Sequence, residues 1–108
     1  MTFPYSRQRI TFNDIESVKK VLRSDLITQG PIVKKLEQKI KKKFNSKYSI
    51  CVNSATSGLH LACIAIGLKE KDILWTVSNT FVSSANCGRL CGATIDFKDL
   101  NLETYNVD

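Results

Sequence analysis

The sequence predicts an α/β fold in which helices alternate with mainly parallel strands. One observation is the pattern of residues 48–108, where short apolar runs are separated by segments with helical periodicity. Another is the way these runs are connected, because strands joined through a helix run parallel to each other. Ligands of such sheets collect at the carboxyl ends of the strands, so any site is expected in the loops that follow the strands.

The first part of the chain is expected to form two helices and a connector. Asn13 caps a first helix that ends near Ser24, and its apolar residues keep a helical spacing: Ile15, Val18, Val21 and Leu22. Gly30 ends the connector, and Pro31 suits the first turn of a second, lysine-rich helix that runs to about Phe44.

The second part of the chain is expected to alternate between strands and helices. In chain order, the predicted elements are a strand at 48–53, a helix at 57–66, a strand at 73–77, a helix at 82–91 and a strand at 94–97. The continuous apolar run at 73–77 is typical of a strand buried on both faces. Since these elements make only half of a doubly wound layer, the chain is predicted to be one incomplete domain, 1–108. Helices and a connector occupy 1–47, and the start of an α/β domain occupies 48–108.

The composition is that of a globular protein. The 108 residues carry a net charge of +6, with 43% apolar and 24% charged residues, which is not typical of a disordered chain. No apolar run approaches the length of a membrane span, and the first residues lack the basic and apolar regions of a secretory signal. A soluble, cytoplasmic protein with no membrane partner is therefore expected.

Most of the positive charge lies between Lys34 and Lys47. A basic patch can mark a nucleic-acid partner, so a small nucleic-acid-binding domain is one alternative. The apolar residues of this segment recur at helical spacing, which leaves most lysines on other, solvated faces: Val33, Leu36, Ile40 and Phe44. No Arg-rich or aromatic stripe accompanies the lysines, and no nucleic acid is expected as a partner.

The cysteines at positions 51, 63, 87 and 91 each lie inside an apolar pattern. Disulfide frameworks favour short, loop-rich secreted chains, so these residues are expected to be reduced, buried thiols. A zinc site built from His60, Cys63, Cys87 and Cys91 is the alternative. Structural zinc sites usually have a tighter Cys-x-x-Cys spacing on loops, and no metal site is predicted.

The candidate site is the junction NSATSGLH at residues 53–60, between an apolar run and a helical pattern. Such a junction directs backbone N–H groups and the positive end of a helix dipole to one spot, which favours a phosphate. A second loop, after the run at 73–77, offers the ring of Phe81 to the same crevice. The two loops together indicate a phosphorylated aromatic cofactor. Taken separately, Thr56 and Ser57 also suit an ordinary helix N-cap, and Phe81 also suits a core aromatic.

The chain resembles the DegT/StrS family of sugar aminotransferases that depend on pyridoxal 5′-phosphate (PLP). The segments that carry the resemblance, in the order of the family, are residues 4–8, 24–31, 52–62, 72–87, 92–93 and 95–97. Lys71 stands where many relatives have glycine, and Val77 where many have proline. Leu74-Trp75-Thr76 and residues 84–87 resemble the branch that makes a UDP-linked amino sugar for pseudaminic acid.

The resemblance implies a fold-type I large domain and a role for particular residues. The cofactor-binding residues it implies are Ala55, Thr56 and Ser57, which hold the phosphate, and Phe81, which stacks on the pyridine ring. The segment Thr28, Gln29 and Gly30 is expected on the substrate side, near the subunit contacts, with a plain connector as the alternative.

The resemblance also implies a reaction and partners. An amino-acid donor, glutamate by expectation, gives its amino group to C4 of a UDP-linked 4-keto-6-deoxy sugar, and the enzymes are homodimers. No lysine of this chain matches the context of the family's Schiff-base lysine, so no catalytic residue is assigned and the chain alone is expected not to transaminate. The alternative is an inactive truncated remnant or a split half.

Overall fold

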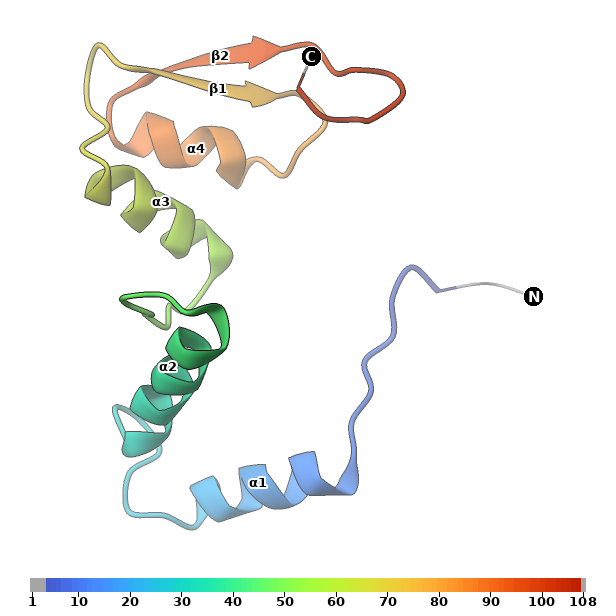
Figure 1. Ribbon diagram of the computed structural model, residues 1–108, viewed down its shortest axis with the longest axis vertical. Helices are drawn as coiled ribbons and strands as arrows, with labels where there is room; N and C mark the ends of the chain where they lie inside the picture. Colours follow the sequence, from blue (N-terminus) through green and yellow to red (C-terminus); the bar gives the residue numbers. More distant parts are fainter. Residues whose placement is uncertain (1–3, 108) are drawn as a thin grey trace. The chain divides into compact units, whose positions relative to one another are not determined.

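The computed structural model describes residues 4–107, and the chain divides into two compact units, residues 1–51 and 52–108 (Figure 1). The first unit contains α1 (Phe12–Leu22) and α2 (Pro31–Phe44). The second contains α3 (Ala55–Ala65), β1 (Ile73–Val77), α4 (Ser83–Leu90) and β2 (Thr94–Lys98). Within the described residues, none of these helices combines the length and apolarity needed to cross a bilayer.

Helix α1 begins with a capping box. The Thr11 side chain accepts a hydrogen bond from the Asp14 N–H at 3.4 Å, and Asp14 Oδ2 accepts one from the Thr11 N–H at 2.7 Å. The expectation that Asn13 caps this helix is wrong. The N-cap is Thr11, because its reciprocal bonds with Asp14 start the helix earlier. The backbone hydrogen bond from Thr11, and then that from its hydroxyl, lower the pKa of the Asp14 carboxyl.

Helix α2 confirms the expected bounds, from Pro31 to Phe44. Gly30 is the N-cap and is buried, and a Cβ at this position would lie 2.7 Å from the Leu26 carbonyl oxygen. A larger residue would therefore force the connector to move. Asn45, with φ of 49°, ends the helix in the left-handed region that asparagine tolerates.

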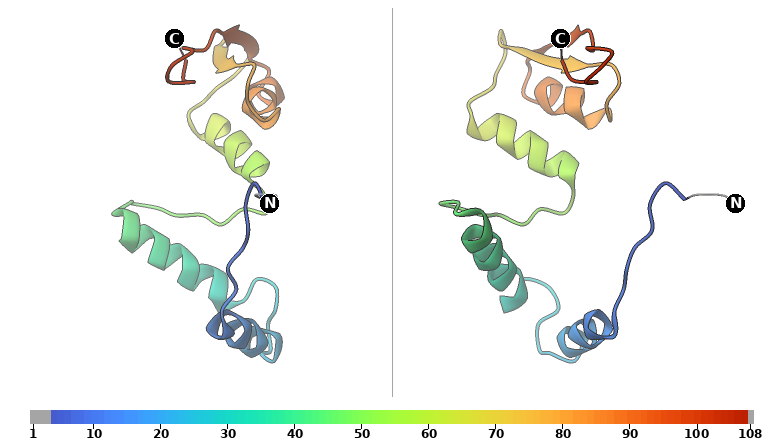
Figure 2. Two further views of the ribbon diagram at one scale, coloured as in Figure 1. Left: turned by 90° about the vertical axis from the view of Figure 1, so that its right-hand side faces the viewer. Right: turned by 45° about the vertical axis from the view of Figure 1, so that its right-hand side comes forward.

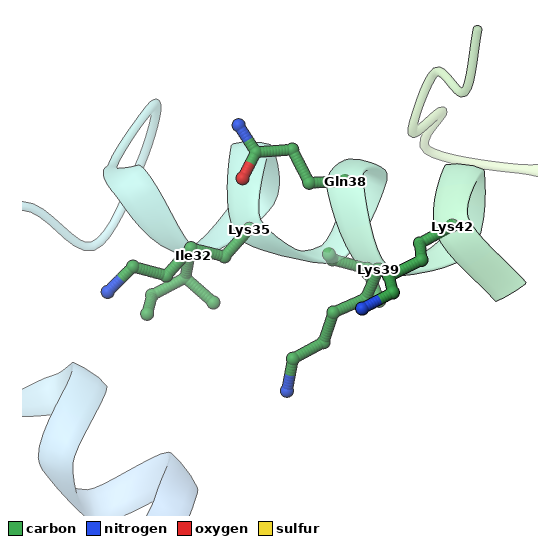
Figure 3. Close-up of a pocket in the computed structure, with 6 residues that line it drawn as sticks. Ile32, Lys35, Gln38, Lys39 and Lys42 are labelled. Atoms are coloured by element: carbon green, nitrogen blue, oxygen red, sulfur yellow. The ribbon is translucent and has the colours of Figure 1, made fainter. Parts of the chain in front are cut away.

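The lysines of α2 are exposed, as the helical spacing predicts. The close-up in Figure 3 shows Lys35, Lys39 and Lys42 along a hollow that also includes Ile32 and Leu36. The apolar residues of α2 are exposed as well, and Leu36 keeps 49% of its surface accessible. The lysine stems therefore border an apolar face that the described residues leave open.

The expected first strand, residues 48–53, is wrong. This segment has no strand assignment, and the Cys51 N–H donates to Glu37 Oε1 of α2 at 2.9 Å. An extended segment becomes a strand only when a neighbour pairs with it, and the described residues supply no such neighbour. The Cys51 thiol is exposed, so the expectation that it is buried is also wrong. The segment that carries it has no neighbouring strand to cover it.

The second unit contains the parallel pair that the sequence predicts. Strands β1 and β2 align Ile73 with Thr94 and Val77 with Lys98. Helix α4 contacts both strands and α3, so it lies between the sheet and α3 (Figures 1 and 2). The expectation that β1 is buried on both faces is wrong: Ile73 and Trp75 are exposed, because helices of the described part cover only the other face.

The core of the second unit lies where α4 meets its neighbours. Gly88 is buried, and a Cβ there would lie 2.8 Å from Leu74 Cδ1, so the absence of a side chain lets α4 pack closely on the sheet. Cys63 of α3 and Cys87 of α4 are buried, as expected. Burial, and then a hydrogen bond with Cys87, raise the pKa of the Cys63 thiol to about 11.

Candidate functional site

The predicted site lies at the first turn of α3. The helix begins at Ala55, earlier than expected, so that Thr56 and Ser57 belong to its first turn. Its N-cap is Ser54, whose hydroxyl accepts a hydrogen bond from the Ser57 N–H at 3.2 Å. The capping role that Thr56 and Ser57 could have had is therefore filled by Ser54, and the Thr56 side chain is available for other contacts.

This first turn has unpaired donors and no opposing charge. The N–H groups of Ala55 and Thr56 have no carbonyl of α3 to pair with, and no acceptor among the described residues. No acidic residue lies in the first turn. The N–H groups and the helix dipole therefore make this end of α3 favourable for an anion.

Thr56 connects this turn to the beginning of α4. Its Oγ1 lies 2.7 Å from the hydroxyl oxygen of Ser83, the first residue of α4, and Ser83 is 4% exposed. Figure 1 shows α3 and α4 beginning on the same side of the second unit, the side to which the arrowheads of β1 and β2 point. The candidate site is therefore at the carboxyl edge of the sheet, as predicted for a parallel arrangement.

Phe81 is in the loop between β1 and α4, two positions before Ser83. The residue is 72% exposed, so within the described residues it is not a core aromatic. Its carbonyl accepts a hydrogen bond from the Ser84 N–H at 2.9 Å, which joins the loop to the first turn of α4. The exposed ring is thus available for stacking near the site.

A hollow of about 440 Å³ lies beside Thr56. Asn86, Arg89 and Leu90 of α4 form the rest of its lining. Sequence reasoning missed these residues and Ser83, although Asn86 and Arg89 have the helical spacing that places two side chains on one face. Arg89 lies in the last turn of α4 and adds a positive charge to the lining of this hollow.

The other predicted site residues belong to the first unit. Thr28, Gln29 and Gly30 form the connector between α1 and α2, and Gln29 has φ of 52°. Within its own unit this segment is a tight bend whose Gly30 is buried. A substrate-side role for these residues stays a prediction.

The lysines of the second unit lie either on the face of the sheet opposite α4 or at the edge where the strands begin. Lys98 Nζ is 2.6 Å from Asp96 Oδ2 and 4.9 Å from the ring centre of Trp75. Trp75 pairs with Asp96 across the sheet, so all three side chains share the face opposite α4. Lys69 and Lys71 precede β1 and therefore lie at the other edge of the sheet.

The described residues do not form the alternative zinc site. Residues 4–107 contain no group of three or more His, Cys, Asp or Glu side chains arranged to hold a metal ion. Cys63 and Cys87 instead form part of the contact between α3 and α4.

Comparison with known proteins gives a consistent result. The DegT/DnrJ/EryC1/StrS aminotransferase family matches residues 8–108. The chain is 38% identical, over 96 residues, to UDP-4-amino-4,6-dideoxy-N-acetyl-β-L-altrosamine transaminase of Campylobacter jejuni, covering 89% of this chain and 25% of that protein.

Solved structures are similar as well. One is a candidate sugar aminotransferase of Streptococcus pneumoniae in its PLP form, with a TM-score of 0.90 and 30% sequence identity. The match covers 100% of this chain and 28% of the S. pneumoniae chain. An aminotransferase from Psychrobacter cryohalolentis matches 91% of this chain and 26% of its own, with a TM-score of 0.79 and 26% identity. The chain thus spans about a quarter of the length of the relatives it matches.

Proposed function

Because the chain belongs to the DegT/DnrJ/EryC1/StrS aminotransferase family, we propose that it forms the cofactor-phosphate site of a sugar aminotransferase that uses PLP. The observation that carries the proposal is the first turn of α3, with its unpaired N–H groups, hydroxyl side chains and lack of acidic residues. These groups fit a phosphate, which takes hydrogen bonds from backbone amides at helix N-termini.

Each residue has a distinct part in this proposal. The N–H groups of Ala55 and Thr56 and the hydroxyls of Thr56 and Ser57 hold the phosphate, and the exposed Phe81 ring packs on the pyridine. When bound, PLP supplies the electron-withdrawing ring that stabilises negative charge at the reacting carbon. In this proposal the chain contributes binding and orientation, and we expect no lysine of its second unit to act as the catalytic base or nucleophile.

We further propose the substrate class from the relative in C. jejuni, whose name describes transamination of a UDP-linked amino sugar. The reaction would transfer an amino group from glutamate to C4 of a UDP-linked 4-keto-6-deoxy sugar in the cytoplasm, within a homodimer.

The test of this proposal is a chimera in which this chain replaces the matching quarter of the C. jejuni enzyme. Retained transamination supports the assignment, and its loss in a folded chimera contradicts it.

Binding of the phosphate is tested on the chain itself. The probe is 4-deoxypyridoxine 5′-phosphate, which has a methyl group in place of the aldehyde and so cannot react with surface lysines. Isothermal titration calorimetry compares it with 4-deoxypyridoxine, which lacks the phosphate. We expect the phosphorylated compound to bind more tightly, and Thr56→Ala to weaken it by about tenfold, as for one hydrogen bond to a charged group. Equal affinity for the two compounds would contradict the proposal.

The matched control is Thr94→Ala, because Thr94 is a threonine of the same unit at the other edge of the sheet. This change should leave both affinities unaltered.

The nucleic-acid alternative predicts that DNA binds the lysines of α2 with an affinity that falls steeply with salt. We expect no such binding in a titration at low and high salt.

A further inference from the structure

Ser83 has a buried hydroxyl that the cofactor contacts proposed above do not include. The residue is 4% exposed, and its hydroxyl oxygen lies 2.7 Å from Thr56 Oγ1. Either hydroxyl can donate in a bond of this kind. Among the described residues, the hydrogen-bond partner of the Ser83 hydroxyl is the Thr56 hydroxyl.

The difference in exposure decides which hydroxyl donates. If Thr56 donated, the proton of Ser83 would be buried with no acceptor, and a buried donor without a partner is costly. If Ser83 donates, its proton is paired, and the proton of Thr56 is free on the exposed side of the bond. The second arrangement pairs the buried donor, in keeping with the described residues, which contain no buried side-chain N or O atom without a partner.

We propose that Ser83 is a positioning residue that donates to Thr56 Oγ1 and so directs the Thr56 hydroxyl proton toward the cofactor phosphate. This inference rests on the proposed function. Two hydroxyls in series ending on an anion polarise each other, which strengthens the final hydrogen bond to the phosphate. Ser83 itself does not touch the ligand.

Variants of the full chain test this role. Ser83→Ala removes the donor, Thr56→Ala removes the group through which it acts, and the double variant removes both. The matched control is Ser84→Ala, because Ser84 lies in the same helical turn and pairs with Thr80 at 3.0 Å instead of with Thr56. Affinity for 4-deoxypyridoxine 5′-phosphate and for 4-deoxypyridoxine is measured by calorimetry, with circular dichroism as the control for folding.

We expect Ser83→Ala to weaken binding of the phosphorylated probe by about three- to tenfold and to leave the other probe unchanged. Because Ser83 acts through Thr56, adding Ser83→Ala to Thr56→Ala should cause no further loss. Ser83→Thr keeps a hydroxyl and should restore most of the affinity. Phosphorus NMR adds a second readout, in which Ser83→Ala raises the pKa of the bound phosphate.

The outcomes separate this inference from the proposed function. Loss of phosphate-dependent binding in Thr56→Ala, with none in Ser83→Ala, overturns the role of Ser83 alone. Additive losses in the double variant, or equal losses for both probes, also overturn it, because they indicate a general structural effect. No preference of the wild-type chain for the phosphorylated probe overturns the proposed function first.

Discussion

Close packing of α4 on the sheet predicts the effect of adding one methyl group at Gly88. A Cβ there would lie 2.8 Å from Leu74 Cδ1, 3.0 Å from Ile95 Cδ1 and 3.0 Å from Leu74 Cβ. The two Cδ1 atoms are ends of flexible side chains, but Leu74 Cβ is fixed to the backbone. Helix α4 must therefore move away from the sheet in Gly88→Ala, and overpacking of this kind costs about 1–3 kcal/mol.

The matched control is Gly58→Ala in α3. A Cβ at Gly58 would meet only Val52 Cγ2, at 3.4 Å, within 4 Å. Both variants gain the same helix propensity, about 1 kcal/mol, so this contribution cancels between them. Gly88→Ala is expected to have the lower free energy of unfolding, by about 1–3 kcal/mol.

The assay is urea unfolding of each variant, followed by circular dichroism. Because α4 carries Ser83, displacement of the helix should also weaken the bond between Ser83 and Thr56. The reasoning is refuted if Gly88→Ala is as stable as Gly58→Ala, since α4 would then not depend on a close approach to Leu74.

The remaining predictions concern capping, pH and reactivity. Ser54→Ala removes the cap of α3 and should cost about 1 kcal/mol in urea unfolding, whereas a loss below a few tenths would argue against the cap. The pKa of Asp14 is lowered in the folded chain, so the stability that its carboxylate gives α1 is present above about pH 4 and is lost as pH falls below that value. Amide NMR of α1 should show this loss in the wild type and not in Asp14→Asn. The pKa of the buried Cys63 is about 11, so iodoacetamide at pH 8 should label the exposed Cys51 first and Cys63 last, and mass spectrometry finding the reverse would contradict the burial. Borohydride reduction with PLP should fix no stoichiometric adduct at a single lysine, and one such adduct would overturn the assignment of a binding role only.

Local signals predicted the elements that depend on local chemistry. Pro31 after Gly30 predicted the beginning of α2, and the alternation of apolar and helical segments predicted the parallel pairing of β1 with β2. The loops at the carboxyl edge were predicted as well, and the structure brings Thr56 next to the residue that follows the Phe81 loop. The beginning of α2 rests on spacing within a few residues, and the parallel pairing and the position of the loops follow from the order of the elements, both of which a sequence displays directly.

Features that depend on partners distant in sequence were not predicted. Residues 48–53 have the composition of a strand, but pairing decides the assignment, and Cys51 bonds to Glu37 instead. The run at 73–77 has the composition of a doubly buried strand, yet one face is exposed because α4 covers only the other. Ser83 was missed since its role depends on its contact with Thr56 across two helices.

The most direct test of the phosphate site is an amide NMR titration of the 15N-labelled chain with 4-deoxypyridoxine 5′-phosphate. The N–H groups of Ala55 and Thr56 have no acceptor among the described residues, so their signals should shift most on binding. Those shifts should be absent with 4-deoxypyridoxine. Shifts confined to the lysine-rich α2, or no shifts in the first turn of α3, would contradict a phosphate site at this helix.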